Sequence, residues 1–197
     1  MTLNMLIGIL EQGLIYGIMA MGLLITYRIL DFPDLTVDSS FPLGAAVSAT
    51  LTLQGVAPWL TLLIGCAAGG IAGLITGLIH VKCRVRDLLS GIITMTGLYS
   101  INLHIAQNKA NLPLFGAFTK SLPKAISPYT TLIIIFLIAL IAKILLDLFL
   151  RTKCGYLLRA AGDNPSVVTT LSRDQGTVKI LGLIIANALV ALAGAVM

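Results

Sequence analysis

The membrane-spanning character of the chain is plainest in residues 59–79, which read Trp-Leu-Thr-Leu-Leu-Ile-Gly-Cys-Ala-Ala-Gly-Gly-Ile-Ala-Gly-Leu-Ile-Thr-Gly-Leu-Ile. The stretch holds no charged residue, and as a helix it is long enough to cross the hydrocarbon core of a bilayer. Its glycines Gly65, Gly69, Gly73 and Gly77 recur every four residues and share one helix face. Such a face lets two helix backbones approach closely, so we predict that these glycines pack against another helix.

Composition extends this reading to the whole chain. Of the 197 residues, 57% are apolar and 11% are charged, whereas a soluble domain carries about a quarter charged residues. We therefore predict an all-α, polytopic transmembrane bundle with about six membrane segments, the second of them short or broken. The other apolar runs are residues 5–27, 41–53, 88–106, 129–150 and 178–197.

Residues 28–44 form an acidic stretch that prolines interrupt: Arg-Ile-Leu-Asp-Phe-Pro-Asp-Leu-Thr-Val-Asp-Ser-Ser-Phe-Pro-Leu-Gly. Pro33 and Pro42 break a continuous helix. We expect one of residues 38–40 to cap the helix that follows, with Pro42 in its first turn. Irregular backbone is tolerated at membrane depth only where protein or water surrounds it. The alternative is an ordinary turn followed by a slightly short span.

The span at residues 88–106 carries more polar side chains than the other spans. Polar groups inside a span face a partner helix or a water path. Together with two acids of the preceding proline-broken stretch, they are our candidates for a translocation path: Asp34, Asp38, Thr94, Thr96, Tyr99 and Asn102.

Basic residues predict the orientation. Nine of them lie at Arg28, in loop 81–87 and in the stretch 151–179, against three in the loop between residues 106 and 129. The positive-inside rule places the first group, with loops 81–87 and 151–177, in the cytoplasm and the N-terminus outside. The net charge of +5 is thus assigned to topology, and we expect no nucleic-acid partner.

Residues 152–168 read Thr-Lys-Cys-Gly-Tyr-Leu-Leu-Arg-Ala-Ala-Gly-Asp-Asn-Pro-Ser-Val-Val. The stretch resembles the cytoplasmic segment of permease subunits of bacterial ABC importers for branched-chain amino acids and ribose-like sugars. The family pattern reads roughly T-x-x-G-x-x-x-R-A-x-G-x-N-P. Residues 22–38 and 187–195 also fit the family, so the resemblance covers nearly the whole chain. The fixed positions of the pattern are met by Thr152, Gly155, Arg159, Ala160, Gly162, Asn164 and Pro165.

The resemblance implies a permease in a bacterial plasma membrane, working with a second permease subunit (a homodimer), an ABC ATPase and an extracytoplasmic solute-binding protein. Residues 152–176 would form a coupling segment with a short helix near 165–171 seated on the ATPase, flanked by sharp turns at Gly155 and Gly162 and anchored by Arg159. The alternative is a plain cytoplasmic loop with a Gly-Asp-Asn-Pro turn. Family members continue into further spans, so we expect 1–197 to be one permease domain without them.

The implied cargo is a small polar solute, with amino acids favoured by the acidic proline-broken stretch. No phosphate-binding loop motif occurs in the chain, so ATP and Mg²⁺ would bind to the partner ATPase, and we expect neither a cofactor nor a metal on this chain, nor enzymatic activity. A secondary transporter or channel without an ATPase also uses broken helices and is the alternative. An intramembrane enzyme is disfavoured because no catalytic set of side chains is evident.

Overall fold

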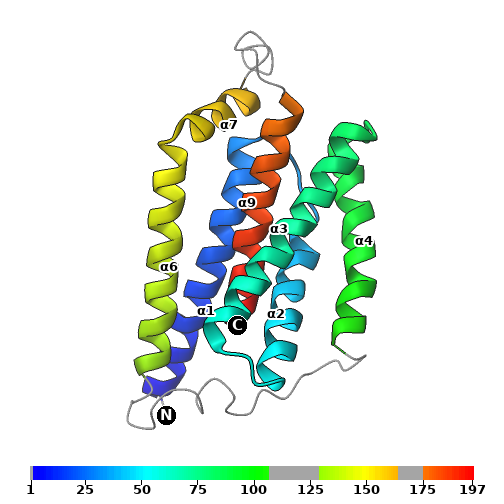
Figure 1. The fold of residues 1–197 in the computed structure, drawn as a ribbon. Coiled ribbons are helices and arrows are strands. Elements are labelled where there is room, and N and C mark those ends of the chain that lie inside the picture. The colour runs from blue at the N-terminus through cyan, green and yellow to red at the C-terminus, as the bar shows by residue number, and fades with distance from the viewer. Residues whose placement is uncertain (1, 107–128, 164–174) are drawn as a thin grey trace.

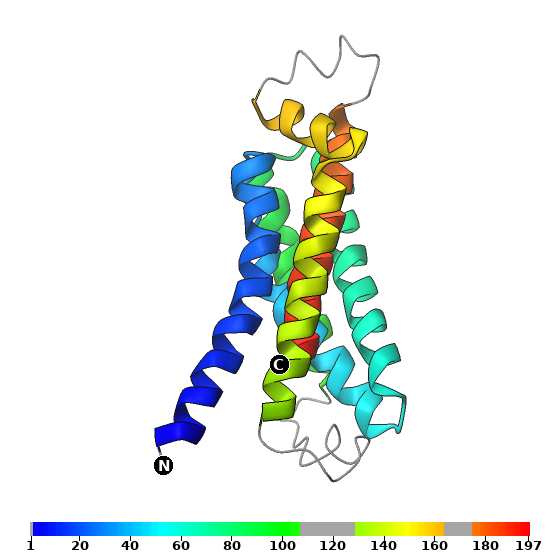
Figure 2. The ribbon, with the colours of Figure 1, turned by 90° about the vertical axis from the view of Figure 1, so that its left-hand side faces the viewer.

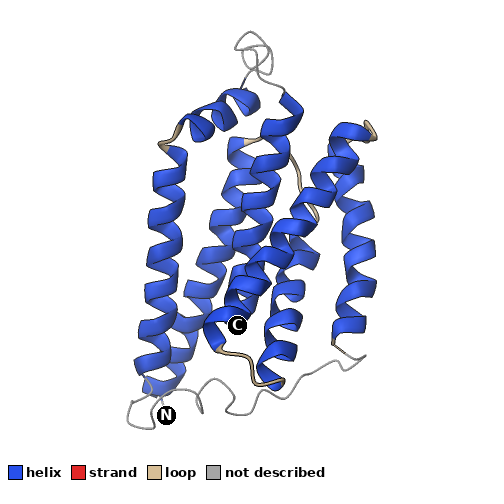
Figure 3. Cartoon of the chain, in the orientation of Figure 1, coloured by secondary structure: helices blue, strands red, loops and turns tan. Residues whose placement is uncertain are grey.

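A computed structural model of the chain describes residues 2–106, 129–163 and 175–197. Every element in these ranges is helical, as predicted (Figure 3). The elements are α1 (Thr2–Leu23), the π-helix η1 (Leu24–Ile29), α2 (Val37–Leu53), α3 (Pro58–Lys82), α4 (Asp87–Ile105), α6 (Tyr129–Leu150), α7 (Lys153–Asp163) and α9 (Gln175–Val196).

Five of the described helical stretches are long and apolar enough to cross a membrane, and α2 lies among them as a shorter helix of 17 residues. The prediction of a polytopic helical bundle with a short second segment is therefore confirmed. Large apolar side chains such as Leu63 and Leu145 are exposed on the outer faces, as lipid contact requires. The five stretches are Met5–Ile29, Pro58–Lys82, Asp87–Ile105, Thr131–Leu150 and Gln175–Val196.

One end of the bundle, at the top of Figure 1, is crossed by α7 and is called the α7 end here. The chain reaches this end at the close of η1, α3 and α6, and leaves it again in α4 and α9 (Figures 1 and 2). This end therefore holds Arg28, loop 83–86 and Arg151, which the distribution of basic residues predicted to lie on one side of the membrane.

Helix α9 lies at the centre, and its neighbours approach it at backbone distance. A β-carbon at Gly69 would overlap the carbonyl oxygen of Asn187, and one at Gly73 would overlap that of Leu183. Gly65 and Gly77 face Ala195 and Ile180 of the same helix. All four glycines singled out in the sequence therefore line one interface, called the α3–α9 seam here. Glycines of α1 and α2, Gly22 and Gly44, also lie against the backbone of α9.

After η1 the chain turns back into the bundle. The backbone N–H of Leu30 donates to the Ile25 carbonyl at 2.9 Å, and that of Phe32 donates to the Thr26 carbonyl at 2.9 Å. Asp31 takes a left-handed backbone conformation, with φ of 52°. Residues 31–36, called the re-entrant segment here, run from the α7 end into the bundle, where α2 begins (Figure 1).

Helix α2 begins earlier than the sequence indicated. The backbone N–H groups of Ser39 and Ser40 donate to the Thr36 carbonyl at 3.0 and 2.9 Å, so Thr36 is the N-cap and the prediction of a cap at 38–40 is wrong. The reason is Asp34, whose carboxylate accepts the Thr36 N–H and fixes the turn upstream. Pro42 consequently lies inside α2 and not in its first turn; lacking an N–H, it leaves the Asp38 carbonyl without that intrahelical bond.

Candidate functional site

A network of buried polar groups holds the re-entrant segment against α9 and α2. The carboxylate of Asp34, which is 1% exposed, accepts the Thr36 N–H at 2.8 Å and the side-chain amide of Asn187 at 2.8 Å. The amide of Asn187 also donates to the Leu183 carbonyl at 3.1 Å, and its oxygen accepts the hydroxyl of Ser40 at 2.7 Å. Every polar atom of the Asp34 and Asn187 side chains is thereby engaged.

A second contact joins the re-entrant segment to α3. The hydroxyl oxygens of Thr36 and Thr76 lie 2.8 Å apart, and both residues are fully buried. The hydroxyl of Thr76 donates to the Ala72 carbonyl of its own helix at 3.1 Å. Because a hydroxyl has one proton, the Thr36 hydroxyl must be the donor between the two threonines.

Helix α4 is fastened to the start of α2. The hydroxyl of Ser39 donates to the Met95 carbonyl at 3.0 Å, and the side-chain amide of Asn102 donates to the Ser39 carbonyl at 3.0 Å. The amide oxygen of Asn102 is buried and has no hydrogen-bond partner among the described residues. Such an orphaned acceptor is rare in a protein interior.

The Asp34 carboxylate forms no ion pair within the described part of the chain. A charged carboxylate in the centre of a span costs about 2.5–3.5 kcal/mol on insertion scales. Hydrogen bonds from an amide and a backbone N–H offset part of that cost, since bonds to a charged group contribute about 1.5–3 kcal/mol each. The arrangement lets a non-helical segment lie among the spans, where lipid does not meet its backbone.

The six residues predicted for a solute path fall into two groups. Asp34, Thr94 and Asn102 are buried. Asp38 in α2 is exposed, and so are Thr96 and Tyr99 on α4. Helical periodicity explains the split on α4, because Thr94 and Asn102 lie eight residues apart and share the face toward α2.

Helix α7 carries the described part of the predicted coupling segment. Thr152 caps it: the Thr152 hydroxyl oxygen accepts the Gly155 N–H at 3.4 Å, and the Thr152 carbonyl accepts the Tyr156 N–H at 3.1 Å. Leu158 is buried against the bundle, whereas Tyr156 and Arg159 are exposed. The helix is thus amphipathic, with polar side chains on its exposed face, and it lies across the end of the bundle (Figure 2).

Gly155 and Gly162 serve close approach and not turns. Both lie within α7. A β-carbon at Gly155 would lie 2.5 Å from the Leu150 carbonyl oxygen, and one at Gly162 would overlap the Ile29 carbonyl oxygen. The prediction of sharp turns at these glycines is therefore wrong, because they let α7 sit directly on the ends of α6 and η1. Ala160 is half-buried in the same helix, while Asn164, Pro165 and the helix predicted at 165–171 lie outside the described residues.

Comparison with known protein families matches residues 5–197 to the model of the branched-chain amino acid transport system / permease component. The chain belongs to this permease family. The matched residues include the whole re-entrant segment together with α2, α3, α7 and α9. No solved structure matches the chain.

Curated relatives of this permease differ in their named cargo. The tyrosine transport system permease protein of Clostridioides difficile is 44% identical over 98% of the chain and 63% of its own length. The probable branched-chain amino acid permease protein LivH of Methanocaldococcus jannaschii is 28% identical over 94% of the chain and 64% of its length. The ribose import permease protein RbsC of Escherichia coli is 26% identical over 98% and 60%. The chain thus spans less than two thirds of the length of these three relatives.

Sequence reasoning missed several partners of the permease network. Asn187 was part of a stretch that fits the family, but its bond to Asp34 spans 153 residues of chain, and hydropathy carries no information on such pairs. Its signal was a single amide in an otherwise apolar span, which usually meets a partner inside a bundle. Ser40, Thr36 and Thr76 gave a weaker signal, because hydroxyls in helices commonly bond their own backbone.

Proposed function

We propose that this permease forms the membrane-spanning part of an ATP-driven importer in a bacterial plasma membrane. The observation that carries the proposal is α7, an amphipathic helix seated on the bundle by Gly155 and Gly162 with Tyr156 and Arg159 facing outward. A helix held so closely to α6 and η1 passes a push on its outer face to the spans. It is therefore suited to receive motion from a cytoplasmic ATPase.

The partners follow from this role. An ABC ATPase would bind and hydrolyse ATP with Mg²⁺, because the permease sequence has no phosphate-binding loop motif. A second permease subunit, a second copy of this chain, would complete the path, and an extracytoplasmic binding protein would deliver the solute. The permease itself would hold no cofactor and catalyse no reaction.

The proposed cargo is an amino acid, with aromatic ones included. The relative named for tyrosine transport is 44% identical, against 26% for the one named for ribose. The matches to both relatives cover 98% of the chain, so the difference in sequence identity does not arise from unequal coverage. Asp34, Thr94 and Asn102 remain the inner candidates for the path, and the exposed Asp38, Thr96 and Tyr99 are candidates to face it from a surface shared with the second subunit.

The α7 end is proposed to face the cytoplasm, with the N-terminus outside. Exposed basic residues gather at this end, and the positive-inside rule assigns such an end to the cytoplasm. The residues are Arg28, Lys82, Arg84, Arg86, Arg151, Lys153 and Arg159.

A secondary transporter or channel is the second candidate, favoured by the re-entrant segment, since broken helices at membrane depth also form ion and solute sites there. The two functions differ in one respect: only the importer needs an ATPase on α7.

The test uses the permease co-expressed with its cognate ATPase. Arg159→Glu should weaken co-purification of the ATPase about tenfold, since reversing an interface charge removes an attraction and adds a repulsion. Tyr156→Ala should weaken it less. Trp59→Ala is the matched control, because Trp59 is an exposed aromatic residue like Tyr156 (73% against 61%) but lies at the start of α3, away from the α7 end. Association and stimulated ATP hydrolysis that stay at wild-type levels in both α7 variants would contradict the proposal.

A further inference from the structure

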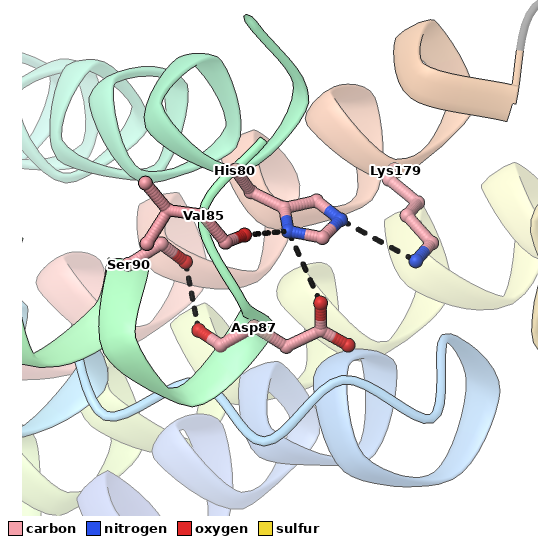
Figure 4. Close-up of polar contacts among 5 residues, drawn as sticks. All are labelled: His80, Val85, Asp87, Ser90 and Lys179. Carbon is pink, nitrogen blue, oxygen red and sulfur yellow. Dashed lines mark hydrogen bonds and ion pairs between the residues drawn. The ribbon is translucent and has the colours of Figure 1, made fainter. Parts of the chain in front are cut away.

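A second polar cluster lies at the α7 end, apart from the network around Asp34. His80, in the last turn of α3, stands between the start of α4 and the start of α9 (Figure 4). Its ring nitrogen Nδ1 lies 2.8 Å from the Val85 carbonyl and 3.1 Å from the Asp87 carboxylate, and Nε2 lies 3.5 Å from the ammonium of Lys179. One imidazole therefore touches the ends of three helices.

The hydrogen-bond partners of the two ring nitrogens indicate which tautomer of a neutral imidazole fits the cluster. The ammonium of Lys179 can only donate, so Nε2 must be the acceptor. The Val85 carbonyl and the Asp87 carboxylate can only accept, so Nδ1 must carry the proton. A neutral imidazole with its proton on Nδ1 satisfies all three partners at once.

His80 also touches the re-entrant segment. The ring of Phe32 packs edge-on against the imidazole, with centroids 5.2 Å apart and an interplanar angle of 81°. Phe32 is fully buried and lies two residues before Asp34. Edge-to-face ring pairs hold a preferred geometry, so the positions of His80 and Phe32 depend on each other.

The same helix completes the link at its other end. Lys179 and Asn187 lie eight residues apart, about 12 Å along α9. Asn187 binds Asp34, while Lys179 contacts His80. The re-entrant segment is therefore held twice by α9, directly through Asn187 and through Lys179, His80 and Phe32.

We propose that His80 is a positioning residue that couples the α7 end of the permease to the re-entrant segment. The inference rests on the proposed function. Helix α9 begins at Gln175, within the end of the predicted coupling segment 152–176, so motion there reaches Lys179 within the first turns of α9. A β-carbon at Gly176 would overlap the side chain of Val81, so the start of α9 packs directly against the end of α3. His80 passes that movement to Phe32, and Phe32 passes it to the segment that carries Asp34.

The experiment uses the full transporter with its ATPase and binding protein in proteoliposomes, with radiolabelled tyrosine as the probe. Uptake and ATP hydrolysis are measured together, because their ratio reports coupling, whereas partial misfolding lowers both equally. His80→Ala should lower tyrosine taken up per ATP by about tenfold, within the range of typical coupling between sites. His104→Ala is the matched control, since His104 is exposed in the last turn of α4 and should leave the ratio unchanged.

Two further variants guard against a folding defect. His80→Gln places an amide oxygen near Nε2 and should recover part of the ratio by accepting from Lys179. Lys179→Met keeps the imidazole and should lower the ratio less than His80→Ala does. This inference is contradicted if His80→Ala leaves the tyrosine taken up per ATP unchanged, or if uptake and hydrolysis fall in equal proportion across these variants. Either result would leave the proposed function intact. A wild-type complex without ATP-driven tyrosine uptake overturns the proposed function and this inference with it.

Discussion

The α3–α9 seam and the re-entrant segment meet the same helix in opposite ways. In the seam, glycines bring backbone against backbone, and Gly69 and Gly73 leave no room for a side chain. In the re-entrant segment, polar side chains span the gap, as Asn187 does for Asp34. Asn187 takes part in both: its backbone carbonyl lies in the seam, and its side-chain amide lies in the network. Close packing resists displacement, whereas hydrogen bonds can exchange partners, so we expect the seam to be the rigid part of the bundle and the re-entrant segment to be the part that can move.

The largest effect is expected in the seam. Gly73→Val places a branched side chain against the Leu183 carbonyl and must push α3 from α9, at a cost of about 3 kcal/mol in the free energy of unfolding. Thermal unfolding in detergent measures it. Gly97→Val is the control, because a β-carbon at Gly97 has nothing within 4 Å. Equal stability of the two variants would contradict close packing in the seam.

The next effect lies in the network. Asn187→Ala leaves the Asp34 carboxylate and the Ser40 hydroxyl without their amide partner, and should cost about 2–3 kcal/mol because a buried charged acceptor loses a bond. Chemical denaturation in detergent measures the change. Adding Ser40→Ala to Asn187→Ala should then cost little more, since the shared bond is already lost. Fully additive losses would show that the two side chains act independently.

A smaller loss is expected for one hydroxyl. Thr36→Val removes the bond to Thr76 and keeps the side-chain shape, so it should cost about 1 kcal/mol. Thr96→Val is the matched control, because the Thr96 hydroxyl is exposed and bonds only carbonyls of its own helix, those of Ile92 and Ile93. The same denaturation assay applies. If the control loses as much unfolding free energy as Thr36→Val, the hydrogen bond between Thr36 and Thr76 does not stabilise the fold.

The smallest effect is expected at Asn102. Asn102→Leu gives up the bond to the Ser39 carbonyl but also removes a buried oxygen without a partner, so the unfolding free energy should change by about 0.5 kcal/mol or less. Tyrosine uptake by the reconstituted complex is the second readout. If uptake falls while stability is unchanged, Asn102 belongs to the path. A large loss of stability would show that removing the unpaired oxygen does not offset the lost bond to the Ser39 carbonyl.

The spans and the glycine face could be predicted from the sequence because both are patterns within one helix. Residues 65–77 show their shared face without any knowledge of the partner. The start of α2 was misplaced because its turn is fixed by Asp34, which lies upstream of the expected cap. The pairing of Asp34 with Asn187 and of His80 with Lys179 depends on which helices are neighbours, and no local pattern encodes that.

The glycines of the coupling segment teach a related point. A glycine permits turns and close approach alike, and the sequence does not distinguish the two uses. At Gly155 and Gly162 the neighbouring backbones of Leu150 and Ile29 decide in favour of close approach. The motif therefore predicted a coupling segment at 152–176, whereas the close seating of α7 on α6 and η1 depends on tertiary contacts.

Cross-linking from α7 tests the central claim most directly. Single cysteines are placed at Arg159 and, as control, at Trp59, which is 73% exposed at the start of α3, in a chain whose Cys66, Cys83 and Cys154 are replaced by serine. Membranes with co-expressed ATPase and binding protein are then treated with a short reagent that joins a thiol to a lysine amine, so that the ATPase needs no cysteine of its own. The account predicts an adduct with the ATPase from Arg159→Cys and none from Trp59→Cys. An ATPase adduct from Trp59→Cys, or its absence from Arg159→Cys, would contradict it.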